Sequence, residues 1–206
     1  MGIAKTGVTA LIEGKNTNSK VVALRGDMDA LPIKEANDVP YKSKNEGVMH
    51  ACGHDVHTAS LLGTARILQA MKEDFDGVVK LIFQPGEEKN PGGASLMIND
   101  GVLKNPAPAS IFGQHVMPLI PVGKVWFRSG MYMARADAIY LTIKGTGGHG
   151  AIPEHLTDTV LITSHIILAL QQLIRRNADP TQPTVLSFCT VDAIGSPTII
   201  PTAVHV

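Results

Sequence analysis

The stretch Met49-His50-Ala51-Cys52-Gly53-His54-Asp55-Val56-His57-Thr58 places one thiol and three imidazoles close together in the chain. Cysteine and histidine both ligate borderline-soft divalent metals, so a Cys-x-His pair can bind one ion or two neighbouring ions. The alternative is a chance cluster at a helix start, with Asp55 stabilised by the helix dipole. Spacing alone leaves both interpretations open, because Cys-x-His lacks the paired-ligand regularity of a structural zinc motif.

A helical pattern begins within this stretch. From Asp55 to Lys72, apolar residues recur at helical spacing, which places the metal-type side chains at a helix N-terminus. A buried strand is expected at Val78–Gln84 from its length and branched residues. With a strand over Lys20–Leu24 before the helix, the order is β-α-β and predicts a right-handed parallel crossover. The apolar positions of the helix are Val56, Ala59, Leu62, Ala65, Ile67, Leu68 and Met71.

Upstream of the cluster, two β-rich runs over Gly7–Glu13 and Lys20–Leu24 are separated by a polar turn, so we expect a hairpin that enters the sheet. Asp27 and Asp29 follow the second run. Open α/β sheets build their sites just past the carboxyl ends of strands, which favours a functional role for these carboxylates. The alternative is an Asp-rich turn without a function.

Two further strands also end in candidate site residues. Glu87 and Glu88 follow the strand over Val78–Gln84, and His115 ends a short apolar strand that begins at Ala109. A Glu-Glu pair is often only a solvated acidic loop, and a lone histidine is usually packed or on the surface. Their repeated position at strand ends favours one common site. A helix is expected between the two strands, over Ala94–Leu103.

Composition excludes several classes of function. The 206 residues carry 18 basic and 18 acidic side chains, so no net charge points to nucleic acid or an anionic membrane as a partner. No apolar run reaches the length of a bilayer span. The first residues, 1–6, lack the features of a signal peptide, which predicts a cytoplasmic protein. Cys52 and Cys189 do not form a disulfide framework; Cys189 is expected to be a buried apolar residue in a strand.

The sequence changes character after His115, which predicts a second unit. A glycine-rich loop over Gly145–Pro153 belongs to this unit, but its spacing does not match the loops that cradle phosphates. His155, His165 and His205 carry no functional signal. The expected elements are strands over Gly123–Arg128, Ala136–Lys144 and Pro183–Ala193 and an apolar helix over Thr157–Arg176.

Four motifs in order resemble a known family: Gly26–Pro32, Ala51–Thr58, Phe83–Glu88 and Gly113–Val116. They are similar to the motif set of the aminoacylase and carboxypeptidase type of co-catalytic metallopeptidases. The resemblance is closer to the branch of hippurate hydrolases, N-acyl-amino-acid amidohydrolases and plant auxin-conjugate hydrolases. It implies an α/β fold: a mixed-sheet, phosphorylase/hydrolase-like catalytic domain and a partial α+β, ferredoxin-like satellite domain that forms dimers.

The resemblance also implies the domain limits and the site. Residues 1–133 would form the metal-binding catalytic domain and residues 134–206 the satellite domain, both incomplete. Two divalent ions (zinc, manganese, nickel or cobalt) would be bridged by Cys52. Glu87 would be the general base, Asp29 would orient a ligand or the base, and His149 would reach the site, often that of a partner subunit. The other implied ligands are His54, Glu88 and His115; His50 and His57 are expected to be supporting or packed.

The implied activity is cleavage of the amide bond of a small N-acyl or N-aroyl amino acid by a metal-activated water. Family members have a further helical segment before the region that matches Met1. They also continue beyond the region that matches Val206, where the last ligating histidine lies, so the chain is expected to be truncated at both ends. An inactive remnant, or half of a split enzyme that binds metal and dimerises, is therefore the alternative. A redox sensor centred on Cys52 is a third hypothesis.

Overall fold

A computed structural model describes residues 2–133 and 136–206. The chain divides into two compact units, Met1–Lys124 and Val125–Val206. The expected division after Met133 adjoins residues 134 and 135, which lie outside the described residues, so that boundary stays a prediction. No helix in the described part of the chain is long and apolar enough to cross a bilayer.

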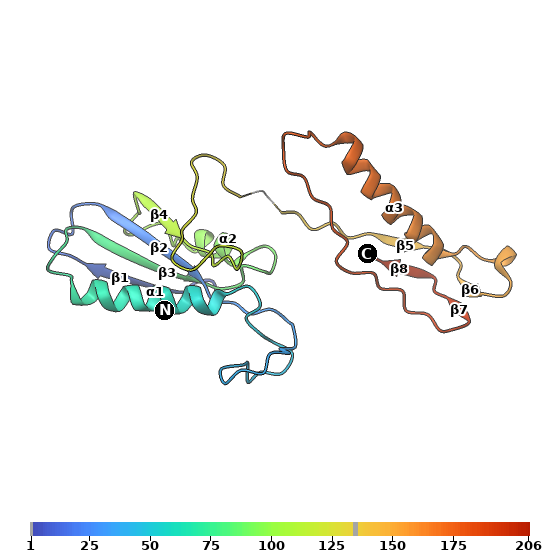
Figure 1. Cartoon of the computed structure of the whole chain (residues 1–206), viewed down its shortest axis with the longest axis horizontal. Coiled ribbons are helices and arrows are strands. Elements are labelled where there is room, and N and C mark those ends of the chain that lie inside the picture. The colour runs from blue at the N-terminus through green and yellow to red at the C-terminus, as the bar shows by residue number, and fades with distance from the viewer. Residues whose placement is uncertain (1, 134–135) are drawn as a thin grey trace. The chain divides into compact units, whose positions relative to one another are not determined.

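The first unit is built on a four-stranded mixed sheet (Figure 1). In the order β1-β3-β2-β4, its strands are Val8–Glu13, Val78–Gln84, Val21–Asp27 and Ser110–Gly113. The strand β2 runs parallel to both β3 and β4, whereas β1 runs antiparallel to β3. The expected mixed sheet and the parallel β-α-β unit are thereby confirmed.

The expected hairpin of the first two strands is wrong, because β3 lies between them. Val78 faces both Glu13 of β1 and Val21 of β2. The polar turn after β1 is hydrogen-bonded to the segment that enters β3, through Gly14 N–H to the carbonyl of Gly77. The physical reason is burial: β3 is the most buried strand of the sheet, so the position between two neighbours covers the most apolar surface.

Helix α1, His54–Ala70, occupies the expected segment and packs on one face of the sheet (Figure 1). Its buried Leu61 joins Ile12 and Leu81 in a core cluster, with Ala65 and Leu68 packed against it. The remaining apolar positions of the predicted pattern, Val56, Ala59, Leu62, Ile67 and Met71, are exposed. The buried stripe of the helix therefore runs through His54, His57 and Leu61 and not through the predicted Val56, Ala59 and Leu62.

The opposite face of the sheet carries the shorter helix α2, Gly93–Asn99, where a helix over Ala94–Leu103 was expected. Met97 packs there with Ala23 and Ile82. Lys80 is also buried on β3, and its Nζ donates hydrogen bonds to the carbonyls of Lys104 at 2.8 Å and Pro106 at 3.1 Å. These bonds tether the segment that leads into β4.

The second unit has two short ladders and one long helix (Figure 1). Helix α3, Thr159–Asn177, is capped by Asp158, whose side chain accepts hydrogen bonds from the N–H groups of Val160 and Leu161. It packs against β5 and β8. The other elements are β5 Thr142–Lys144, β6 Gly148–His149, a 3-10 turn Pro153–His155, β7 Ile199–Ile200 and β8 Ala203–His205, with β5 pairing β8 and β6 pairing β7 antiparallel.

Three strand predictions in this half need correction. No strand forms over Gly123–Arg128 or Pro183–Ala193, and of Ala136–Lys144 only the last three residues are a strand. A strand needs a continuous partner, and within the described residues Asp192 forms only an isolated bridge with His205. The described part of this unit contains a long helix and short antiparallel ladders. The satellite domain, its ferredoxin-like fold and its dimerisation remain predictions.

Candidate metal centre

The candidate site residues lie at the carboxyl ends of the parallel strands and at the start of α1. Asp27 ends β2, Glu87 follows β3 and His115 follows β4. Parallel strands present their carboxyl ends at one edge of the sheet, so residues far apart in sequence meet there. The arrangement explains why each predicted motif follows a strand or precedes the helix.

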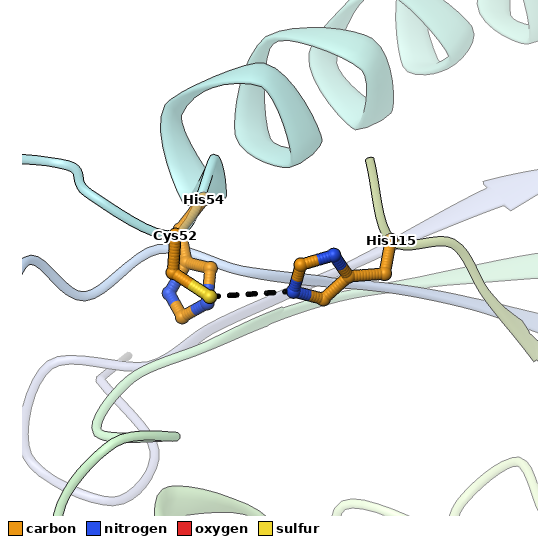
Figure 2. A group of neighbouring side chains, drawn as sticks. All are labelled: Cys52, His54 and His115. Carbon is orange, nitrogen blue, oxygen red and sulfur yellow. Dashed lines mark hydrogen bonds between the residues drawn. The ribbon is translucent and has the colours of Figure 1, made fainter. Parts of the chain in front are cut away.

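Cys52, His54 and His115 form one group of potential metal ligands (Figure 2). Cys52 Sγ lies 3.4 Å from His115 Nε2. A second group joins His54 with the carboxylates of Glu87 and Glu88. Within each group the ligand atoms lie within 4.8 Å of one another. The structure thus brings the predicted ligands into two groups that share His54, rather than into a single group.

His54 is buried, and only one of its two ring nitrogens is hydrogen-bonded within the described residues. Its Nδ1 lies 3.0 Å from the carbonyl oxygen of Asp29 and 3.2 Å from Asp29 Oδ1, both of which only accept, so Nδ1 carries the proton. Its Nε2 has no hydrogen-bond partner among the described residues, although Asp27 Oδ2 stands 3.7 Å away. A buried acceptor without a partner is costly, and a cation at this position would satisfy it.

Asp29 joins the two ligand groups. Its Oδ1 faces His54, and its Oδ2 accepts a hydrogen bond from the backbone N–H of Glu88 at 3.0 Å. Burial acts to raise the pKa of Asp29, but the hydrogen bonds from the Glu88 and Glu87 backbones and the nearby His54 outweigh it and lower the pKa. Asp29 is therefore an ionised carboxylate that fixes His54 and the Glu88 backbone relative to each other.

A buried Asp27–His57 pair is the part of the site that the sequence interpretation did not assign. Asp27 Oδ1 lies 2.5 Å from His57 Nδ1, and Asp27 Oδ2 forms an ion pair with Arg25 at 2.7 Å. Burial acts to raise the pKa of Asp27, but the hydrogen bond from His57 and the charge of Arg25 lower it overall. Helical periodicity was the sequence signal that could have indicated a role for His57, because His57 stands three residues after His54 and so lies on the same face of the helix.

Cys52 is half-buried beside two carboxylates. Burial raises the pKa of its thiol to about 11, and the neighbouring Glu88 and Glu87 act in the same direction. Without a cation, this cysteine is therefore a neutral thiol at pH 7. A bound divalent ion would favour the thiolate, and the thiolate, imidazole and carboxylate donors together suit zinc and its divalent neighbours. The residues present fit a metal centre.

Three other residues of the prediction belong to neither of the two ligand groups. His149 is exposed on β6 of the second unit, and its Nδ1 accepts a hydrogen bond from the N–H of Ala151 at 3.1 Å. Its approach to a metal site stays a prediction. His50 is exposed. Cys189, expected to be buried, is exposed, because the strand that would have packed it does not form.

Comparison with known proteins identifies the class of this chain. The model of the peptidase family M20/M25/M40 matches residues 23–200. The matched region contains the ends of the parallel strands, α1 and most of the second unit. The chain belongs to this family, as the four motifs indicated.

Three individual relatives show how similar the chain is to members of this family. The chain is 43% identical to a hippurate hydrolase of Campylobacter jejuni over 97% of its own length and 51% of the relative's. It is also 43% identical to an N-acetylcysteine deacetylase of Bacillus subtilis, over 96% of this chain and 51% of the relative. A solved dinuclear metal-binding M20 peptidase of Bacillus subtilis superposes with a TM-score of 0.63 at 36% identity, covering 98% of this chain and 50% of that one. The chain therefore spans about half the length of the relatives it matches.

Proposed function

We propose that this chain carries the metal centre of an amidohydrolase that cleaves the amide bond of N-acyl or N-aroyl amino acids. One observation carries the proposal: His54, whose buried Nε2 has no hydrogen-bond partner among the described residues, belongs to a group with Cys52 and His115 and to a group with Glu87 and Glu88. The lone pair of His54 Nε2 can bind one cation, and the thiol, imidazole and carboxylate donors around it offer ligands for a second ion beside it. The hippurate hydrolase and deacetylase relatives support the substrate class.

In this proposal, Cys52, His54, Glu88 and His115 would hold two divalent ions. Bound metal would lower the pKa of a water molecule and polarise the scissile carbonyl. The solved dinuclear relative supports a pair of ions. Zinc, manganese, nickel and cobalt all accept this donor set, so the ligands alone do not select among them.

Glu87 is the proposed general base. Glu87 and Glu88 are both exposed, and the backbones of both are hydrogen-bonded to Asp29. An exposed carboxylate beside the ligand group can take the proton of the attacking water and return it to the leaving amine. Asp29 is proposed to keep His54 in the tautomer that leaves Nε2 free, which is the role of a carboxylate behind a metal-bound histidine.

The second unit completes the proposal. As a satellite domain it would form a homodimer, and His149 would assist the substrate of the partner subunit. An imidazole at that position would stabilise the substrate carboxylate or the developing oxyanion. A cytoplasmic location fits an enzyme that acts on small N-acyl amino acids.

The test is hydrolysis of N-acetyl and N-benzoyl amino acids by the purified chain with added manganese or zinc, beside the Glu87→Gln variant. We expect turnover in the wild-type protein and its loss in the variant. Equal turnover in both would contradict the assigned base. Bound metal without any turnover would instead favour the alternative of an inactive remnant or half of a split enzyme, because the chain covers about half of its relatives.

The thiol-sensor alternative loses support from the structure. Reactive cysteines have a lowered pKa, because the thiolate is the reacting species. Burial and two neighbouring carboxylates raise the pKa of Cys52 instead. The environment therefore suits a metal ligand better than a redox-active thiol.

A further inference from the structure

The backbone of Val116 connects the buried Asp27–His57 pair to His115. Val116 N–H donates a hydrogen bond to His57 Nε2 at 2.9 Å. The carbonyl of Val116 lies 2.6 Å from His115 Nδ1. Both polar groups of a single residue are therefore occupied by two different imidazoles, one buried on α1 and one beyond the end of β4.

These contacts fix the tautomer of each ring. A backbone N–H only donates, so His57 Nε2 is unprotonated and His57 Nδ1 carries the proton that it donates to Asp27. A carbonyl only accepts, so His115 Nδ1 carries a proton and its Nε2 offers a lone pair as an acceptor. That Nε2 is the atom that lies 3.4 Å from Cys52 Sγ.

Close packing holds the same segment in place. Gly53 has a φ of +81°, and a Cβ added to it would lie only 2.3 Å from Cγ2 of Val116. The absence of a side chain at Gly53 thus lets Val116 approach the backbone between Cys52 and His54. The rings of His57 and His115 have their centroids 4.7 Å apart.

Besides Val116 and the ring of His57, His115 contacts the Cys52 thiol through its Nε2. It is exposed, and it stands two residues beyond β4, whose residues are all exposed. His57, by contrast, is about 1% exposed and is held by Asp27, itself paired with Arg25. The rigid partner in this contact is therefore His57.

We propose that His57 is a positioning residue that holds His115 in its metal-binding orientation through the backbone of Val116. Asp27 sets the tautomer of His57, His57 fixes Val116 N–H, and the Val116 carbonyl keeps the proton of His115 on Nδ1. The link to metal binding rests on the proposed function, whereas the control of the His115 tautomer does not.

Two substitutions of His57 separate the two hydrogen bonds of its ring. In His57→Gln the side-chain oxygen can occupy the position of Nε2 and accept from Val116 N–H. In His57→Asn the shorter amide retains a donor toward Asp27 and does not reach Val116. His57→Gln therefore keeps the contact with Val116 and loses the one with Asp27, whereas His57→Asn keeps the contact with Asp27 and loses the one with Val116. Val116→Pro removes the donated N–H and leaves His57 intact, as a third variant should His57→Asn fail to fold.

The experiment is imidazole nitrogen NMR of the metal-free chain of residues 1–206. We expect His115 to be the Nδ1–H tautomer in the wild-type protein and in His57→Gln, and to become a tautomeric mixture in His57→Asn and Val116→Pro. An unchanged His115 tautomer in folded His57→Asn or Val116→Pro would overturn the proposal, whatever the outcome of the hydrolysis assay.

Cobalt titration of the same proteins measures the consequence for metal binding. We expect His57→Asn to weaken cobalt binding about 10–100-fold, the usual effect of removing a residue that supports a ligand. In a His115→Ala background the same substitution should have no further effect, because His57 acts through His115. Additive losses would show that His57 acts elsewhere. A wild-type chain that binds no metal would contradict the proposed function, while the NMR result would still decide the positioning role.

Discussion

The two sides of the metal centre are built differently. Asp27, His54 and His57 are each about 1% exposed and are held by side-chain contacts in the core. On the other side, Glu88 and His115 are exposed, and Asp29 and Val116 hold them through backbone hydrogen bonds. The exposed side is thus joined to the core, because Asp29 also contacts His54 and Val116 also contacts His57. Substitutions on the two sides should therefore fail in different ways.

The largest expected effect is on catalysis, at the exposed side. Glu87→Gln should reduce kcat about 10²–10⁴-fold, the contribution of a general base, while the metal content stays at the wild-type value. Steady-state kinetics and metal analysis of the same preparation measure both quantities. Glu88→Gln is the matched control, since it should lower metal affinity. If Glu87→Gln lost metal instead, the roles of the two neighbours would be reversed.

The next effect is on stability, at the buried side. Asp27→Ala should lower the free energy of unfolding by about 3–5 kcal/mol, because it leaves the charge of Arg25 and the proton of His57 without their partner. Urea unfolding monitored by circular dichroism measures it. Glu46→Ala is the control, since it breaks an exposed ion pair with Lys34 and should cost at most about 1 kcal/mol. An equal loss of unfolding free energy in Asp27→Ala and Glu46→Ala would contradict the distinction between a buried and an exposed side.

Asp27 also predicts how this stability depends on pH. Its pKa is lower in the folded than in the unfolded protein. Its contribution is therefore fully present above the unfolded value of about 3.9 and is lost as the pH falls through the lower folded value. Unfolding of wild type and Asp27→Ala should converge in acid, and a difference that persists there would contradict the assignment.

A smaller effect, on metal affinity, is expected at Asp29, which contacts both the buried His54 and the exposed Glu88. Asp29→Ala removes the acceptor from His54 and from the Glu88 backbone. We expect metal affinity to fall about 10–100-fold with little change in the folded core. Cobalt titration together with thermal unfolding distinguishes these readouts. An unchanged affinity would mean that the Asp29 carbonyl alone orients His54.

The smallest expected effect concerns the reactivity of Cys52. Its pKa of about 11 means that alkylation of the metal-free protein should be slow at pH 7 and accelerate as the pH rises toward that value. The rate is measured by mass spectrometry in a Cys189→Ser background, which removes the exposed second thiol. Added zinc should protect Cys52 at every pH. Fast alkylation at pH 7 would contradict the influence of burial and of the two glutamates.

Local sequence patterns predicted the strands and the helix that carry the site. They did not predict which strands pair with one another. Val78–Gln84 was predicted to the residue, because a short run of branched apolar side chains marks a buried strand. The hairpin was wrong because strand order depends on which strand gains most from the central position. The hydrogen bond from Val116 to His57 joins residues 59 positions apart and uses a backbone N–H, so no pattern of side chains in the sequence indicates it.

The same distinction applies to the candidate site. Cys52, His54 and the two glutamates stand in short motifs whose residue types carry the chemistry, and the structure gathers them into ligand groups. His57 stands in the same motif, but its part depends on the distant Asp27 and Val116. In the second unit the predicted strand over Pro183–Ala193 did not form, because a strand propensity has no effect without a partner strand.

The order of the strands along the chain has a consequence for protein synthesis. β2, α1 and β3 are consecutive, and the ligand group of His54, Glu87 and Glu88 lies entirely before β4. The ribosome adds about 5–20 residues per second, so these side chains leave the ribosome before His115 does. His115, the last member of the other ligand group, therefore joins the candidate site only after all the residues of the group with the two glutamates have been synthesised.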